Sequence, residues 1–160
     1  RVIGRALKIL AEKAGIHGMI GGQVVDVKES GHSISADMLD FIYRLKTGAL
    51  IESSVMIGAV LAGASEKEVL QVESVAAKVG MAFQIQDDIL DVTSTTEILG
   101  KPVHSDEKNE KTTYVTLKGT DESGREVERL TTEALGELKE LGRENEFLNK
   151  LLEWLVYREK

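Results

Sequence analysis

The 160 residues contain 42% hydrophobic and 29% charged side chains, the proportions of a globular domain rather than of a disordered, fibrous or membrane-spanning chain. Twenty basic and 27 acidic residues leave a net charge of -7, and no stretch combines Lys and Arg with aromatic residues, so nucleic acid is excluded as an expected partner. The chain has no cysteine, which excludes thiolate chemistry and suits a reducing compartment. We therefore expect a cytoplasmic protein without membrane insertion.

Hydrophobic residues at helical spacing predict helices over most of the sequence, and only one proline interrupts them. Glycine stops and N-cap residues such as Ser35, Ser65 and Asn145 set the expected boundaries. The helices are predicted at about residues 2–14, 19–28, 36–46, 48–62, 65–92, 122–141 and 146–159. No alternating strand pattern is present, so the predicted fold class is all-α, with long helices packed roughly antiparallel in a bundle.

The pattern stops between Thr93 and Thr112, where Thr, Ser, Gly, Pro and charged residues predict one long loop. Long loops in compact domains often carry functional residues. This loop contains Lys101, Asp106 and Lys111, whose lysines could hold phosphate oxygens, although charged loop residues are more often only solvated.

Acidic residues form a stripe on one predicted helix. Gln84, Asp87, Asp88 and Asp91 stand at relative positions 0, 3, 4 and 7, which places them on one face. A solvated acidic surface is the simplest explanation, but the flanking residues are apolar, and unpaired Asp is costly in such a helix. Oxygen ligands without His or Cys favour Mg²⁺ completed by phosphate oxygens, so we expect a phosphorylated substrate.

Three further groups are candidates for a site. Lys46 and Thr47 lie among apolar residues, where Lys46 either extends to solvent or meets an anion, and Gly48 could open or kink the helix there. Gln23 and Asp26 form either a core hydrogen-bond pair or a polar pocket lining. Phe83, beside the acidic stripe, could form a pocket wall. The three histidines lack the spacing of a zinc site.

Five motifs occur in a set order along the chain: G-M-I-G-G-Q-V-V-D, K-T-G-A-L-I, F-Q-I-Q-D-D-I-L-D, G-K and K-T-T-Y. In this order and spacing the sequence resembles the trans-isoprenyl diphosphate synthases, the polyprenyl synthetase family of farnesyl and geranylgeranyl diphosphate synthases. The resemblance implies an isoprenoid synthase type fold, of which residues 1–160 would be the C-terminal portion of a single helical domain.

The resemblance also implies roles for individual residues. Asp87, Asp88 and Asp91 would form the second aspartate-rich motif and bind Mg²⁺, with about three ions per active site. Asp106 would add to the metal site, and Lys46, Lys101 and Lys111 would bind diphosphate. Thr47 and Gln84 would act at the reacting centre, with Gln23, Asp26 and Phe83 lining the pocket.

The implied activity is that of a dimethylallyl, geranyl or farnesyl transferase. An allylic diphosphate would ionise, isopentenyl diphosphate would attack the cation, and farnesyl or geranylgeranyl diphosphate would form, in a homodimer. The first aspartate-rich motif and the family's upstream basic site are absent from these residues, so we expect the 160-residue chain alone to be inactive. The alternatives are a non-catalytic or regulatory partner subunit of a heteromeric synthase and, less favoured by the D-D-x-x-D motif, a terpene cyclase.

Overall fold

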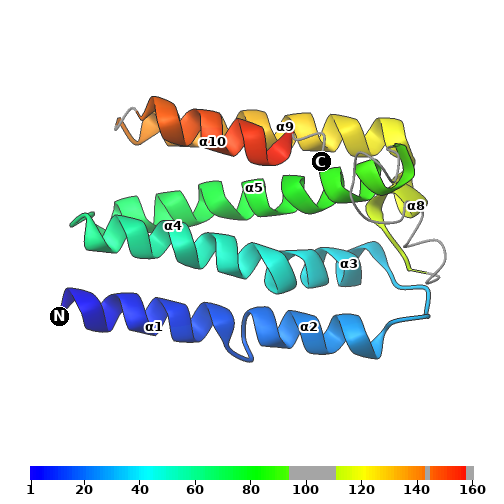
Figure 1. The fold of residues 1–160 in the computed structure, drawn as a ribbon, viewed down its shortest axis with the longest axis horizontal. Coiled ribbons are helices and arrows are strands. Elements are labelled where there is room, and N and C mark those ends of the chain that lie inside the picture. The colour runs from blue at the N-terminus through cyan, green and yellow to red at the C-terminus, as the bar shows by residue number, and fades with distance from the viewer. Residues whose placement is uncertain (94–110, 143–144, 158–160) are drawn as a thin grey trace.

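The computed structural model describes residues 1–93, 111–142 and 145–157, and each regular element within them is a helix (Figure 1). The elements are α1 (Val2–Ala14), α2 (Met19–Lys28), α3 (Ala36–Tyr43), the π-helical segment η1 (Arg44–Gly48), α4 (Ala49–Leu61), α5 (Glu66–Thr93), α8 (Tyr114–Lys118), α9 (Thr120–Glu140) and α10 (Glu146–Val156). The all-α prediction is confirmed. The predicted loop, with Lys101, His104 and Asp106, falls almost entirely outside the described residues.

The helices form successive rows in which neighbouring rows run in opposite directions (Figure 1). Helices α1 and α2 lie end to end in one row, and α3, η1 and α4 return beside them as the second. Helix α5 packs against α4 on one side and against α9 on the other, and α10 contacts both α5 and α9. The expected antiparallel bundle is therefore present, with α5 as its central helix.

Side-chain caps fix the helix boundaries as the sequence predicts. The Ser35 hydroxyl accepts a backbone hydrogen bond at the start of α3. At the start of α5, the Ser65 amide donates to Glu68 Oε2 at 2.7 Å and the Glu68 amide donates to Ser65 Oγ at 3.3 Å, which is a capping box. At the start of α10, Asn145 Oδ1 accepts a hydrogen bond from the Leu148 amide at 3.0 Å. These local contacts explain why helix positions could be read from the sequence.

Helix α8 is the one described helix that the sequence patterns did not predict. Thr113 precedes it, and its hydroxyl accepts from the Thr116 amide at 3.2 Å while the Thr113 amide donates to Thr116 Oγ1 at 2.8 Å. Gly119 then adopts φ 80°, a conformation that favours glycine, and so turns the chain into α9. A helix of five residues is too short to show a hydrophobic period.

Two apolar clusters hold the bundle together. The larger one joins α5 to α3, α8, α9 and α10, and the smaller one joins α1, α4 and the start of α5. The larger cluster includes Leu39, Ile42, Tyr43, Val75, Val79, Ala82, Ile85, Tyr114, Val127, Leu130, Ala134, Leu138, Leu152 and Val156. Because α5 contributes to both clusters, side chains near its C-terminal end are held in a fixed position. Within the ranges described, no helix is both long and apolar enough to span a bilayer.

The π-helical segment η1 replaces the kink that Gly48 was expected to introduce. The chain passes from α3 to α4 without a break, and Lys46 and Thr47 lie within the π turn. Such turns are frequent at functional sites because they re-aim side chains. A Cβ on Gly22 would lie 2.4 Å from the backbone nitrogen of Lys46. A Cβ on Gly80 would lie 2.9 Å from the Cα of Gly48. Glycines on α2 and α5 therefore let both helices approach the η1 backbone closely.

Replacing Gly22 with alanine should separate α2 from η1. The added methyl group would clash with the backbone nitrogen of Lys46 and would lie 2.8 Å from the Leu45 Cβ. We therefore expect the free energy of unfolding to fall by about 2 kcal/mol. Urea denaturation of the full chain measures this. Gly136→Ala is the matched control, because a Cβ there meets nothing within 4 Å, and it should stabilise α9 by about 0.5 kcal/mol. Equal effects of the two substitutions would contradict the close approach.

Candidate functional site

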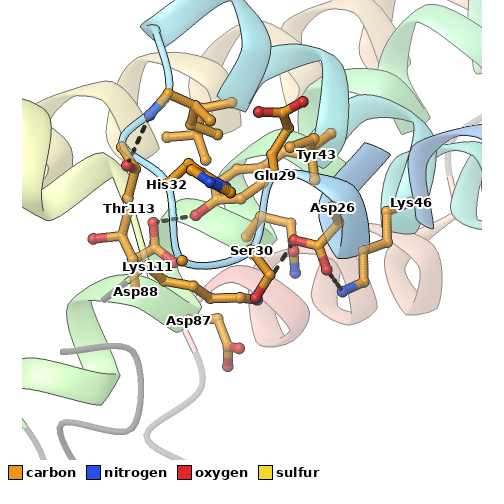
Figure 2. Close-up of a pocket in the computed structure, with 16 residues that line it drawn as sticks. Asp26, Glu29, Ser30, His32, Tyr43, Lys46, Asp87, Asp88, Lys111 and Thr113 are labelled. Atoms are coloured by element: carbon orange, nitrogen blue, oxygen red, sulfur yellow. Dashed lines mark hydrogen bonds and ion pairs between the residues drawn. The ribbon is translucent and has the colours of Figure 1, made fainter. Parts of the chain in front are cut away.

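A cavity of about 300 Å³ opens where α2, α3, η1 and α5 meet the segment 111–113 (Figure 2). Its walls combine acidic, basic and apolar side chains from segments far apart in the sequence. They are Asp26, Glu29, Ser30, Gly31, His32, Ile34, Leu39, Ile42, Tyr43, Lys46, Gln84, Asp87, Asp88, Lys111, Thr112 and Thr113. The cavity is large enough for a small phosphorylated ligand.

Asp26 lies between two lysines at one side of the cavity (Figure 2). Its Oδ2 accepts from Lys46 Nζ at 2.6 Å, and its Oδ1 lies 3.5 Å from Lys111 Nζ. Burial by itself raises the pKa of Asp26, but the hydrogen bond from Lys46 and the charges of both lysines outweigh burial, so the pKa lies below its usual 3.8. Asp26 is therefore ionised at neutral pH and holds both ammonium groups at the cavity.

This geometry decides two questions that the sequence left open. Lys46 meets an anion instead of only extending to solvent, and Asp26 is a polar lining residue that pairs with lysines. Lys46 and Lys111 belong to different segments, so their common partner is what brings two cations to one place. The two ammonium groups therefore line the same cavity as Asp87 and Asp88 of the acidic stripe.

The acidic stripe lies on α5, as predicted, but its members have different surroundings. Gln84, Asp87 and Asp88 line the cavity, whereas Asp91 is only 2% exposed and is not among the lining residues. Consecutive helix positions differ by about 100°, so Asp87 and Asp88 point in different directions, as Figure 2 shows. Asp87 is partly exposed and Asp88 is buried.

Asp88 accepts two hydrogen bonds on one oxygen. The Tyr43 hydroxyl donates to Asp88 Oδ2 at 2.7 Å, and the Tyr114 backbone N–H donates to the same atom at 2.8 Å. The donors belong to the last residue of α3 and the first of α8. One carboxylate on α5 therefore links two other elements of the site.

Other predicted site residues lie elsewhere. Gln23, Thr47 and Phe83 are partly buried but are not among the residues that line the cavity. Lys101 and Asp106 lie outside the described residues. Tyr43 and His32 both line the cavity, although no sequence pattern predicted them as site residues. Tyr43 stands one helical turn before Lys46, and that spacing is the only signal that could have identified it.

The donor set of the cavity fits magnesium shared with a ligand better than a closed metal cage. In the part of the chain that the structure describes, no group of three or more His, Asp or Glu side chains is placed to hold a metal ion. Mg²⁺ is commonly held by one or two carboxylates together with water and phosphate oxygens. The partly exposed carboxylate of Asp87, in a cavity that Lys46 and Lys111 also line, suits this arrangement.

Comparison with known proteins defines the class. The sequence matches the polyprenyl synthetase family over residues 4–151. It is 39% identical to the chloroplastic geranylgeranyl pyrophosphate synthase of Capsicum annuum over 99% of this chain and 43% of that protein. It is 38% identical to the farnesyl diphosphate synthase of Escherichia coli over 94% of this chain and 52% of that protein.

A solved structure shows the same arrangement of helices. The geranyltransferase of Helicobacter pylori, complexed with magnesium and isoprenyl diphosphate, superposes with a TM-score of 0.81 at 33% identity, over 97% of this chain and 51% of that one. The chain therefore belongs to the polyprenyl synthetase family. It spans about half the length of the relatives that it matches.

Proposed function

We propose that this chain supplies the allylic diphosphate side of a short-chain prenyltransferase active site. The observation that carries the proposal is the meeting of Lys46, Lys111 and Asp87 at one cavity. Two ammonium groups beside a partly exposed carboxylate suit a diphosphate with bound Mg²⁺. Family membership and the named relatives support the same reaction class.

In the proposed reaction, Lys46 and Lys111 hold the diphosphate oxygens of the allylic substrate and stabilise the charge that develops as the diphosphate leaves. Bound Mg²⁺ would supply the same stabilisation as a Lewis acid, held by Asp87 at the cavity and, on the resemblance to the family alone, by Asp106. Asp91 is 2% exposed and does not line the cavity, so it is not assigned to the metal in this proposal. Lys101 would add a further contact to the diphosphate. Gln84 lines the cavity and, with Thr47, would act near the reacting carbon.

The apolar part of the cavity has its own role in the proposal. Ile34, Leu39 and Ile42 are among the lining residues, so the cavity offers a hydrocarbon chain some apolar surface as well as charged groups. Such a surface keeps water away from an allylic cation until isopentenyl diphosphate attacks it. We propose farnesyl or geranylgeranyl diphosphate as the product.

The test is a product assay on the complete protein with Mg²⁺, dimethylallyl diphosphate and isopentenyl diphosphate, with products identified by mass spectrometry. Longer allylic diphosphates are the expected products. Hydrocarbons without longer diphosphates would identify a cyclase and contradict the proposal. Turnover that appears only when a second, different subunit is added would identify a partner subunit of a heteromeric synthase.

We propose, on the resemblance to the family alone, that the complete protein is a cytoplasmic homodimer. Exposed apolar side chains on α1, α2 and the turn between them are compatible with further packing of this part of the chain; they include Val2, Ile3, Leu7, Ile16, Val24 and Val27. Light scattering gives the mass of the complete protein in solution. A mass of one chain at micromolar concentration would contradict the dimer.

A further inference from the structure

Asp88 has surroundings that differ from those of a typical metal ligand. It is 7% exposed, and its Oδ2 accepts from both Tyr43 and the Tyr114 amide. A carboxylate oxygen has two lone-pair sites, and these two donors occupy both of them on Oδ2. Coordination of a metal through this oxygen would require breaking a buried hydrogen bond, so a metal could approach this buried carboxylate only through Oδ1.

The Tyr114 amide belongs to a segment that crosses the cavity. Residues 111–114 connect three parts of the site: Lys111 reaches Asp26 on α2, Thr112 Oγ1 accepts from the Ile34 amide at 3.2 Å, and Tyr114 donates to α5. Helix α8 that follows has only five residues, and such a short helix has little stability of its own. The position of Lys111 therefore depends on these three contacts together with the buried Tyr114 side chain, which belongs to the larger apolar cluster.

We propose that Asp88 is a positioning residue, not the metal ligand that the sequence pattern suggests. With Tyr43, it fixes residues 111–114 to α5 and so holds Lys111 at the cavity beside Lys46. Tyr43 orients the carboxylate from α3, and the Tyr114 amide is the point of attachment. The claim that Lys111 binds diphosphate rests on the proposed function. The attachment of residues 111–114 to α5 does not depend on that function.

The first measurement tests the attachment independently of any ligand. Hydrogen exchange of the Tyr114 amide in the full chain should be about tenfold faster in Asp88→Ala, because the buried acceptor is lost. Asp88→Asn keeps an acceptor oxygen and should exchange within about threefold of wild type. The Ala134 amide in α9 reports on the fold and should not change. Equal protection of Tyr114 in Asp88→Ala and wild type would overturn the proposal.

The second measurement is calorimetric binding of inorganic pyrophosphate with Mg²⁺. Asp88→Asn should retain affinity within about threefold, whereas Asp88→Ala and Asp87→Asn should each lose about tenfold. If Asp88→Asn loses as much as Asp87→Asn while the Tyr114 amide stays protected, Asp88 is a metal ligand and the proposal is wrong. If wild type does not bind pyrophosphate, the proposed function fails, and the exchange measurement still decides the attachment.

A double-mutant cycle separates positioning from a purely structural role. Lys111→Ala should weaken pyrophosphate binding about tenfold in wild type, but by less than about twofold in the Asp88→Ala background, where the Tyr114 amide is no longer attached to α5. Tyr43→Phe should show an intermediate coupling to Lys111→Ala, because it removes one of the two hydrogen-bond donors to Asp88. Additive losses for Asp88→Ala and Lys111→Ala would overturn the proposal.

Discussion

Replacing Asp87 with alanine in the complete protein is expected to lower turnover by orders of magnitude with little change in stability. Asp87 is the partly exposed carboxylate of the α5 stripe at the cavity, and it is the residue best placed to hold Mg²⁺ against the diphosphate. In the proposed reaction, Mg²⁺ stabilises charge that develops as the allylic bond breaks, so its loss should lower kcat more than it raises KM. Steady-state kinetics with varied Mg²⁺ measures both.

The matched control for this substitution is Glu153→Ala. Glu153 is an exposed carboxylate on α10, far along the chain from the stripe, and its removal should leave turnover within about twofold of wild type. Thermal unfolding of both variants shows whether the fold is retained. Near-normal turnover of Asp87→Ala at saturating Mg²⁺ would contradict the assignment.

The largest loss of stability is expected from Lys13→Met. Lys13 on α1 pairs with the buried Glu52 on α4, and its Nζ lies 2.5 Å from Glu73 Oε1 on α5. Methionine keeps most of the side-chain volume but leaves the Glu52 carboxylate, 6% exposed, without its cation. Removing one partner of such a pair should cost about 3 kcal/mol, measured by urea denaturation of the full chain.

The pH dependence of this stability difference follows from the pKa of Lys13. Burial by itself lowers this pKa, but the hydrogen bonds and charges of Glu52 and Glu73 outweigh burial and raise it above 10.5. A raised pKa means that the stabilisation is complete below 10.5 and is lost as pH rises through the folded-state value. The difference between wild type and variant should therefore be constant from pH 7 to about 10 and shrink only above that.

Lys150→Met provides the control for Lys13→Met. Lys150 pairs with Glu146 at 2.6 Å on α10, but the two side chains are 72% and 82% exposed. Removing an exposed pair of this kind should change the free energy of unfolding by less than about 0.5 kcal/mol. Losses of equal size in the two variants would show that Lys13 does not hold α1, α4 and α5 together.

Much of the fold could be predicted because helix signals are local. The capping pair Ser65 and Glu68 and the glycine stop at Gly142 lie within a few residues of the ends that they mark. Helix α2 was predicted at residues 19–28 and begins and ends there. Helix α8 was missed because its capping residues, Thr113 and Thr116, enclose too few residues to show a period.

The candidate site could be predicted only in part, because spacing along one helix shows which residues share a face but not what they contact. The stripe from Gln84 to Asp91 was correctly placed on one helix. The hydrogen bonds that bury Asp88 come from Tyr43, 45 residues earlier, and from Tyr114, 26 residues later. No local pattern specifies contacts over such separations.

The sequence by itself determined that this is an all-helical member of the polyprenyl synthetase family with an acidic stripe on a core helix, because helical periodicity, caps and short motifs are properties of neighbouring residues. Only the tertiary structure decided which residues the stripe contacts. The π turn at Lys46, its pairing with Asp26 and the attachment of residues 111–114 to Asp88 arise where α2, η1 and α5 pack. Glycines at the contacts allow that packing, and the side chains then meet across it.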